Sequence, residues 1–263
     1  MNIHNDINRN IKFLAKSEIR LKILNELHKR PNDVRGLVKK TEITYSSVSS
    51  NIMKLEKENY ITKENKLYHI NPLSKIYFTT FMDFKSTVDL INNYDSFWDK
   101  HNLGQLSIES MKNITDLQDS KLIEATPTDI YKTHNTIKNQ LMESKNIKAI
   151  FPYLHPEYPK IIEKTLNNNG SLELILPEII FKEIMSRVNK KTMEKAMQND
   201  KLKIYLFRDD LDLYLTICDE NMSLGLFKND ASFDQNRILI SDNFQSLKWA
   251  KELFEFIKNQ AIE

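Results

Sequence analysis

The fold is decided by residues 44–70, whose sequence is TYSSVSSNIMKLEKENYITKENKLYHI. Within residues 44–58 apolar side chains recur every three or four positions, which predicts an amphipathic helix. Thr44 is expected to be its N-cap and to accept a backbone N–H through its hydroxyl. The remainder predicts a strand, a tight polar turn and a second strand. We expect the core face of the helix to carry Tyr45, Val48, Ile52 and Leu55.

Two further helices are expected before this stretch. Residues 17–29 and residues 32–40 both repeat apolar side chains at helical spacing, and a polar turn follows the second. Asn59 stands where the long helix ends, a position at which Asn tolerates a left-handed backbone. Three helices followed by a hairpin form a winged helix-turn-helix, an architecture that reads DNA. The buried side chains are expected to be Ile19, Ile23, Leu24, Leu27, Val34, Leu37 and Val38.

The charge of the chain is divided unevenly along its length. The 263 residues carry a net charge of +2, which alone indicates little about partners. Residues 1–70, however, hold 14 Lys or Arg and 8 Asp or Glu, a net charge of +6, and the remaining residues hold 24 and 28, a net charge of −4. The positive charge therefore lies in the region predicted to read DNA, as phosphate binding requires.

The outer face of the helix at 44–58 carries the candidate base-reading residues. Short hydroxyl side chains let a helix approach base edges closely, Asn can form a bidentate pair with adenine, and lysines bind phosphates. The alternatives are a solvated helix face, or a winged helix that contacts only proteins. We expect double-stranded DNA to be bound by Lys39, Lys40, Tyr45, Ser46, Ser47, Ser49, Ser50, Asn51, Lys54, Lys57, Lys63 and Lys66.

The shortage of arginine in this region indicates a modest affinity per head. We therefore expect a homodimer that reads two half-sites about 34 Å apart. Residues 73–93 repeat apolar and aromatic side chains at helical spacing and predict a long linker helix. Its aromatic stripe packs either on the second domain or on the same helix of a partner subunit. We favour the partner, by analogy with the linker helices found beside such heads.

Beyond the linker, strands and helices first alternate and then strands cluster, which favours a mixed α/β sheet. The expected class is therefore α+β or α/β, with an N-terminal winged helix-turn-helix (residues 1–72), a linker or dimerisation helix (73–95) and a C-terminal mixed α/β sheet domain for sensing or dimerisation (96–263). Strands are expected at 121–125, 147–151, 171–176, 202–207, 213–218, 223–227 and 237–240, and helices at 127–142, 156–166, 178–198 and 244–259.

No pattern in the sequence indicates catalysis, a cofactor or a metal site. Four glycines offer no phosphate-binding loop, no Gly-x-Ser-x-Gly elbow is present, and the six histidines lack metal-ligand spacing. His101 and His155 are expected to be structural residues. Cys218, the single cysteine, indicates a reducing compartment and a packed thiol. Without a signal peptide or an apolar run of membrane length, we expect a cytoplasmic protein with no membrane partner.

Polar residues within apolar β segments mark where a small-molecule effector would bind. Internal pairing of Arg208 with the aspartates at 209, 210 or 219 is the alternative and is favoured. A second cluster lies in the proline-interrupted loop at 152–159, after an expected strand, where ligands of α/β sheets bind. The candidate effector-binding residues are Tyr153, His155, Arg208, Tyr214, Thr216, Asp219 and Ser223.

Two resemblances support these expectations. Residues 43–61 resemble the recognition helix and first wing strand of ArsR- and MarR-like regulators. FWDKHNL at 97–103, LTICDENMSLGLF at 215–227 and WAKELFEF at 249–256 resemble the archaeal regulators of the methanogenesis-regulatory-protein family, which usually has glycine in place of Ala250. This resemblance covers nearly the whole chain. It implies a cytoplasmic transcription regulator with a winged helix-turn-helix and a C-terminal sensor or dimerisation domain, and it fixes no effector.

We therefore expect a homodimeric DNA-binding transcriptional regulator that reads an operator through its head and is modulated through its C-terminal domain. Ligand control would require unequal affinity for two arrangements of the heads. The alternatives are a metabolite-responsive enzyme fused to a winged helix, and a protein-interaction module whose winged helix contacts no DNA.

Overall fold

The computed structural model describes residues 3–208 and 210–261, with side chains described from residue 9 onward. The chain forms two compact units, Met1–Val88 and Asp89–Glu263. We call them unit 1 and unit 2 and describe each by itself. The division falls inside the helix expected to be a separate linker, so the three-part organisation stays a prediction.

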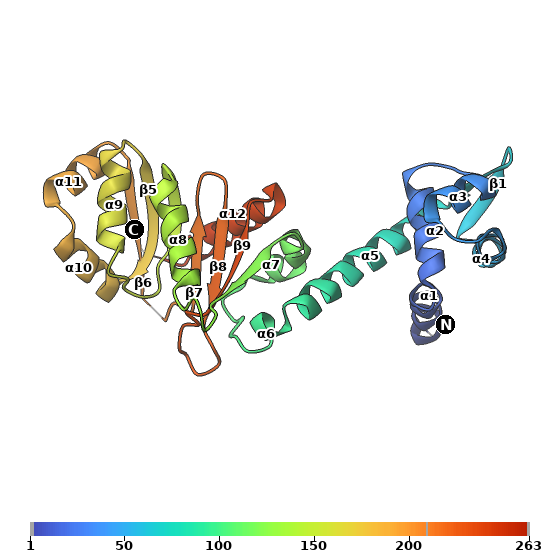
Figure 1. Ribbon diagram of the computed structural model, residues 1–263, viewed down its shortest axis with the longest axis horizontal. Coiled ribbons are helices and arrows are strands. Elements are labelled where there is room, and N and C mark those ends of the chain that lie inside the picture. The colour runs from blue at the N-terminus through green and yellow to red at the C-terminus, as the bar shows by residue number, and fades with distance from the viewer. Residues whose placement is uncertain (1–2, 209, 262–263) are drawn as a thin grey trace. The chain divides into compact units, whose positions relative to one another are not determined.

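Unit 1 contains the expected winged helix, preceded by a helix that we did not expect (Figure 1). The two wing strands pair in antiparallel fashion, and a bridge from Asn32 to Tyr68 ties the wing to the start of the second expected helix. The core is one cluster contributed by these helices and the wing. The elements are α1 (Ile3–Ala15), α2 (Glu18–Lys29), α3 (Val34–Thr41), α4 (Tyr45–Lys57), β1 (Ile61–Glu64) and β2 (Leu67–Ile70).

Local hydrogen bonds and backbone conformations explain where these helices begin and end. Asp33 caps α3, because its carboxylate accepts the N–H of Gly36 at 2.7 Å. Thr44 stands at the N-cap of α4 as expected, but its hydroxyl accepts no backbone N–H and donates instead to Ser47 Oγ at 3.0 Å. The prediction of a capping hydrogen bond is therefore wrong, because the hydroxyl of Thr44 is engaged by the neighbouring hydroxyl of Ser47 instead. Asn59 has a φ of 58°, the left-handed conformation predicted for it.

The linker helix α5 (Pro72–Asn93) is continuous, as predicted, and its apolar side chains divide into a buried and an exposed set. Phe78 is 3% exposed in the core of unit 1, and Leu90 is 3% exposed in the core of unit 2. The exposed set, which we call the α5 stripe, consists of Leu73, Ile76, Tyr77, Phe84, Val88 and Ile91.

Unit 2, within its described residues, is built on a seven-stranded sheet with the order β3-β9-β8-β7-β4-β5-β6 (Figure 1). Strands β4, β5 and β6 are parallel neighbours, and the other pairings are antiparallel. The mixed α/β sheet expected from the sequence is confirmed. The strands are β3 (Lys121–Glu124), β4 (Asn146–Ile150), β5 (Ser171–Pro177), β6 (Leu202–Phe207), β7 (Leu213–Ile217), β8 (Met222–Leu226) and β9 (Arg237–Ser241).

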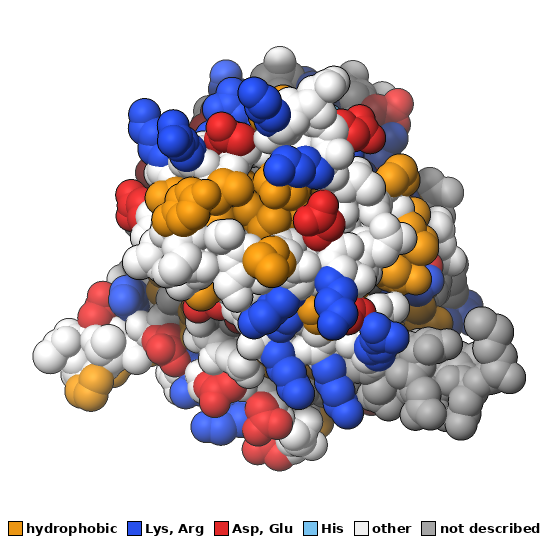
Figure 2. Space-filling model, turned by 90° about the vertical axis from the view of Figure 1, so that its right-hand side faces the viewer, with side chains coloured by type: hydrophobic (Ala, Val, Ile, Leu, Met, Phe, Trp, Pro, Cys, Tyr) orange, Lys and Arg blue, Asp and Glu red, His pale blue; other side chains and the backbone are white. Residues whose placement is uncertain are grey.

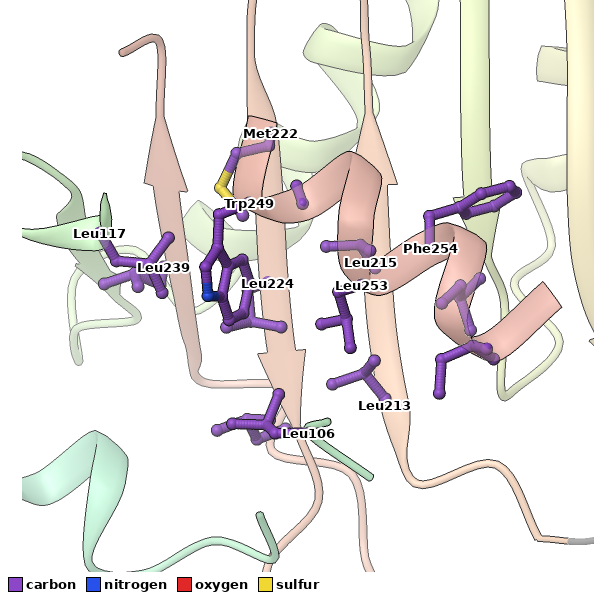
Figure 3. Close-up of a cluster of buried hydrophobic side chains, with 14 of the residues drawn as sticks. Leu106, Leu117, Leu213, Leu215, Met222, Leu224, Leu239, Trp249, Leu253 and Phe254 are labelled. Carbon is purple, nitrogen blue, oxygen red and sulfur yellow. The ribbon is translucent and has the colours of Figure 1, made fainter. Parts of the chain in front are cut away.

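Helices cover both faces of this sheet. Trp249, Leu253 and Phe254 of the last helix pack over the central strands in one core cluster (Figure 3). A second cluster on the opposite face includes Leu141 and Ile162 from two other helices. Because both faces are covered, β7 and β8 are buried along their whole length and read as nearly continuous apolar runs. The helices are α6 (Asp95–Trp98), α7 (Ile108–Lys112), the 3₁₀ helix η1 (Ile114–Leu117), α8 (Lys132–Glu143), α9 (Tyr158–Asn167), α10 (Glu178–Arg187), α11 (Lys190–Gln198) and α12 (Phe244–Lys258).

Three helix expectations in unit 2 differ from the structure. The single helix expected at 178–198 is interrupted, because Asn189 accepts the N–H groups of Lys191 at 3.0 Å and Thr192 at 3.3 Å and so caps a new helix. Residues 127–131 form a turn, and α8 begins only at Lys132. The short α6, α7 and η1 were not expected, since one helical turn gives too little periodicity to detect.

No helix in the described ranges is long and apolar enough to cross a membrane. Cys218 is buried, as expected, and burial raises the pKa of its thiol to about 11. The thiol therefore stays protonated at neutral pH and acts as a packing group.

His101 and Asp234 form a buried pair in unit 2. His101 Nε2 lies 3.1 Å from Asp234 Oδ2, and His101 Nδ1 lies 2.5 Å from Phe97 O. Arg237 donates to the same carboxylate oxygen at 3.1 Å, and the N–H of Asn236 donates to the other oxygen at 3.0 Å. Burial alone would raise the pKa of Asp234, but these hydrogen bonds outweigh it and lower the pKa overall. His101 is a structural residue, as expected.

We expect Asp234→Asn to lower the free energy of unfolding by about 2 kcal/mol at pH 7, because the charged acceptor of His101 and Arg237 is lost. The folded pKa of Asp234 lies below its unfolded value, so the carboxylate stabilises the fold above about pH 4 and loses this effect as the pH falls through the folded pKa. Urea denaturation from pH 7 to pH 3 should show the variant and the wild type converging. A gap that stays constant with pH would contradict the assignment.

Candidate functional site

The outer face of α4 presents polar side chains to solvent. Val48, Ile52 and Leu55 are buried on the inner face, while Ser46 and Ser50 are exposed. Figure 2 views the molecule from the side on which α4 and β1 are labelled in Figure 1, and groups of Lys and Arg side chains flank a hydrophobic strip there. The sequence-predicted division between a core face and a hydroxyl-bearing face is therefore present.

Three of the predicted polar contacts lie closer to the core than expected. Asn51 is only 9% exposed, and its amide donates to Ser47 O at 2.9 Å within the helix. Ser47 and Ser49 are half-buried, and Ser47 Oγ is held by Thr44. Asn51 therefore braces the helix, and its amide is largely buried in this arrangement.

Two apolar side chains of α4 are exposed. Tyr45 was assigned to the core, but its side chain is 59% exposed at the first turn of α4, so that assignment is wrong. Met53 is 66% exposed and was missed, although it follows Ser46 and Ser50 at helical spacing and the sequence could have shown it. Exposed apolar groups on such a face can contact the methyl group of thymine.

The predicted phosphate-binding lysines are mostly available. Lys39, Lys54 and Lys57 are exposed, as are Lys63 and Lys66 in the wing. No ion pair of these five lysines is recorded in the described part of the chain. Lys40 is the exception, because its side chain is 25% exposed and its Nζ lies 3.9 Å from Glu26. Sequence reasoning missed Arg35, which is exposed on α3.

The wing presents its lysines through backbone geometry. Asn65 and Lys66 both have positive φ, at 45° and 72°, as a two-residue hairpin turn requires. Lys66 therefore stands at the tip of the wing. Lys63 Nζ lies 5.3 Å from the centre of the Tyr68 ring, which holds its charge over the strand.

Unit 2 contains a cavity of about 580 Å³ at the carboxyl end of β4. Its walls come from α8, from the loop after β4, from the start of α9 and from the connection between β8 and β9. Because β4 and β5 are parallel, this is the edge of the sheet at which α/β ligands bind. Two of the predicted effector residues, Tyr153 and His155, line it.

One wall of the cavity is aromatic. The ring of Tyr153 lies 4.5 Å from that of Phe233 and 6.0 Å from that of Tyr214, and burial raises the pKa of Tyr153 to about 12. Gly225 makes this packing possible, because a Cβ there would approach Phe233 to 2.9 Å and Tyr214 Cβ to 3.3 Å. The wall is thus preformed by rings that support one another.

Another part of the lining is polar. The rings of His134 and His155 lie 4.3 Å apart, and the N–H of Glu157 donates to His155 Nδ1 at 3.1 Å. Burial, together with the neighbouring His134, lowers the pKa of His155. His155 is therefore neutral near pH 7, and with Nδ1 accepting, its proton sits on Nε2. Lys138 Nζ pairs with Glu157 at 3.0 Å beside them.

The other predicted effector residues do not line the cavity. Thr216 and Ser223 are buried opposite one another in the β7–β8 ladder, and Ser223 donates to Gln140 Oε1 at 2.5 Å. Asp219 accepts the N–H of Lys145 at 2.7 Å. Tyr214 is fully buried behind Tyr153.

Arg208 is exposed and lacks its predicted internal pairing among the described residues. No ion pair joins Arg208 to Asp210 or Asp219 within the described ranges, and Asp209 lies outside the described residues. Among the described residues, no group of three or more His, Cys, Asp or Glu is arranged to hold a metal ion.

Two family models match the chain. The model of the N-terminal domain of the methanogenesis regulatory protein FilR1 matches residues 8–89, and the model of the middle domain of that protein matches residues 130–260. A curated relative, the methanogenesis regulatory protein FilR1 of Methanothrix harundinacea (strain 6Ac), is 23% identical over 261 residues. That match covers 98% of this chain and 58% of the relative, so the chain spans less than two thirds of the relative's length.

Several solved structures are also similar. TrmBL2, an archaeal chromatin protein whose structure shows a novel mode of DNA binding, matches with a TM-score of 0.41 and 13% identity, covering 97% of this chain and 98% of that chain. An IclR transcriptional regulator from Alicyclobacillus acidocaldarius has a TM-score of 0.25 and 9% identity, covering 92% and 95%. An O-methyltransferase family protein from Burkholderia thailandensis has a TM-score of 0.29 and 7% identity, covering 81% and 65%. Scores this low decide nothing about function.

Proposed function

This chain belongs to the family of the methanogenesis regulatory protein FilR1, and from that premise we propose that it is a DNA-binding transcriptional regulator. Unit 1 reads an operator in double-stranded DNA, and unit 2 modulates that binding. The proposal rests mainly on the outer face of α4, where exposed Ser46 and Ser50 stand beside exposed lysines. Short hydroxyls flanked by lysines fit the major groove, where the exposed Tyr45 and Met53 can contact thymine methyl groups.

The contacts divide into base-reading and phosphate-binding groups. Ser46 and Ser50, with Tyr45 and Met53 beside them, face the base edges along the first turns of α4. Asn51 is not included, because its amide is engaged within the helix. Lys and Arg side chains on α3, at the end of α4 and in the wing bind phosphates of the DNA backbone on either side of the base contacts. The phosphate-binding residues are Arg35, Lys39, Lys54, Lys57, Lys63 and Lys66, with Lys40 in a lesser role.

We expect Ser50→Ala and Lys66→Ala to weaken DNA binding in different ways. Ser50→Ala should alter base preference at one operator position by about fivefold, because one hydrogen bond to a base edge is lost. Lys66→Ala should weaken binding to all sequences alike and reduce the salt slope by about one unit. Both effects can be measured by fluorescence anisotropy on duplexes selected from a random pool, at several salt concentrations.

Lys195→Ala is the matched control for the lysine, since Lys195 is exposed on α11 in unit 2. It should leave both affinity and salt slope unchanged. Equal weakening by Ser50→Ala on every sequence would show that Ser50 reads no base. If the wild type selects no duplex even at low salt, unit 1 is a protein-interaction module and the proposal fails.

The α5 stripe supports a homodimer, the second part of the proposal. Part of this stripe follows the spacing of a coiled-coil seam, which alternates steps of four and three residues. The seam positions are, in order, Leu73, Tyr77, Thr80, Phe84, Thr87 and Ile91. Phe84 is 64% exposed and Ile76, beside the seam, is 62% exposed, although both are apolar. A second copy of the same helix offers an identical seam, so pairing buries both stripes and yields two heads.

We expect Phe84→Glu to convert the dimer to monomer, because pairing would bury a charge in the seam. Operator binding should then weaken at least tenfold, since a single head binds one half-site without the help of a second. Phe244→Glu is the matched control, since Phe244 is a comparably exposed phenylalanine on α12. Native mass spectrometry gives the subunit number of each protein. A wild-type monomer, or a Phe84→Glu dimer, would contradict the seam.

We propose further that unit 2 has a regulatory role and catalyses no reaction, and that the protein acts in the cytoplasm, where its operator lies. The cavity of unit 2 offers a binding place for a small-molecule effector. No cofactor is part of the proposal.

A further inference from the structure

We infer that the cavity of unit 2 binds a small aromatic carboxylate, with its ring against Tyr153 and Phe233 and its carboxylate at His155 and Lys138. The inference rests on the proposed role of unit 2 as the regulatory half of the protein. It adds the chemical class of the effector and three residues that were not among the predicted effector-binding residues, His134, Lys138 and Phe233.

The size and lining of the cavity suit a small, largely apolar molecule. At about 580 Å³ it lies within the usual range of ligand sites, about 300 to 1,000 Å³. Ile137 and Leu141 of α8 and Ile161 of α9 contribute aliphatic surface to it. A highly charged or sugar-like ligand would leave many of its polar groups without partners on this surface.

The aromatic wall favours a flat ring. The rings of Tyr153 and Phe233 meet at 4.5 Å with planes tilted by 36°, and Phe151 stacks on Tyr158 at 3.9 Å behind them. Burial raises the pKa of both tyrosines, so their phenols stay neutral. Rings supported in this way can hold a further ring in a stacked or edge-to-face contact without rearrangement.

The polar side of the cavity offers hydrogen-bond donors to an anion. His155 Nδ1 is occupied by the N–H of Glu157, so Nε2–H is the group left to donate. Lys138 has three N–H donors, and Glu157 engages its ammonium at 3.0 Å. The ring of His134 lies 4.3 Å from that of His155 and contributes further ring nitrogens to the polar lining. A cationic ligand would have to compete with Lys138 for the carboxylate of Glu157, and a neutral hydrocarbon would leave the N–H donors of His155 and Lys138 unpaired.

The test compares three probes that share a benzyl group and differ in charge: phenylacetate, 2-phenylacetamide and phenethylamine. Each is added to the 263-residue chain, without DNA, at about 10 mM, because fragments of this size bind in the millimolar range. We expect phenylacetate to raise the melting temperature by about 2 °C, 2-phenylacetamide to have less than half that effect, and phenethylamine to have none.

Variants then locate the site. Lys138→Met keeps the side-chain stem and removes the charge, and Phe233→Leu removes the ring, so each should abolish the phenylacetate shift. Lys195→Met on α11 is the control and should keep it. The melting temperature of each variant without probe shows whether it folds, and if Phe233→Leu fails to fold, Lys138→Met alone decides.

Three outcomes would overturn the inference. They are no shift with phenylacetate, equal shifts with all three probes, and a phenylacetate shift that survives Lys138→Met. These measurements are made without DNA, so their outcome does not depend on whether the protein binds an operator. Loss of DNA binding with an intact phenylacetate shift would refute the proposed function and leave the ligand site standing.

Discussion

The packing of α4 in unit 1 is the constraint on which the proposed DNA reading depends. Val48, Ile52 and Leu55 fill the core, so a helix of 3.6 residues per turn must place Ser46 and Ser50 on the opposite side. When the apolar face of α4 is buried in the core, the hydroxyls of Ser46 and Ser50 are exposed to solvent. The net charge of +6 on residues 1–70 then supplies the attraction to phosphates that any sequence-specific contact requires.

In unit 2 a single loop serves both the core and the cavity. Phe233 and Asn236 line the cavity, while Asp234 between them binds His101 at 3.1 Å. His101 in turn contacts the backbone of Phe97, in the short helix that follows the linker. The ligand proposed beside Phe233 would therefore contact the loop that holds the start of unit 2. It regulates the protein only if it favours one arrangement of this loop over another.

Most elements of the fold could be predicted from apolar spacing, and the exceptions have physical causes. The helix at 178–198 is broken by a capping hydrogen bond of Asn189, which no periodicity reports. Tyr45 was placed in the core by its spacing, but the first turn of α4 lies beyond the edge of that core. Only part of the cavity lining could be predicted from the sequence. Tyr153 and His155 were expected there, but His134 meets His155 only when α8 packs against the loop after β4. Asn51 is buried for a local reason that apolar spacing does not report, the hydrogen bond from its amide to Ser47 O.

Methylation interference on a selected duplex tests the central claim, that α4 reads the major groove, most directly. Dimethyl sulfate modifies guanine N7 in the major groove and adenine N3 in the minor groove. If α4 reads bases, guanine methylation in two patches about 34 Å apart should block binding, and adenine methylation in the same patches should have little effect. Interference confined to adenines, or no interference in either groove, would contradict a base-reading α4.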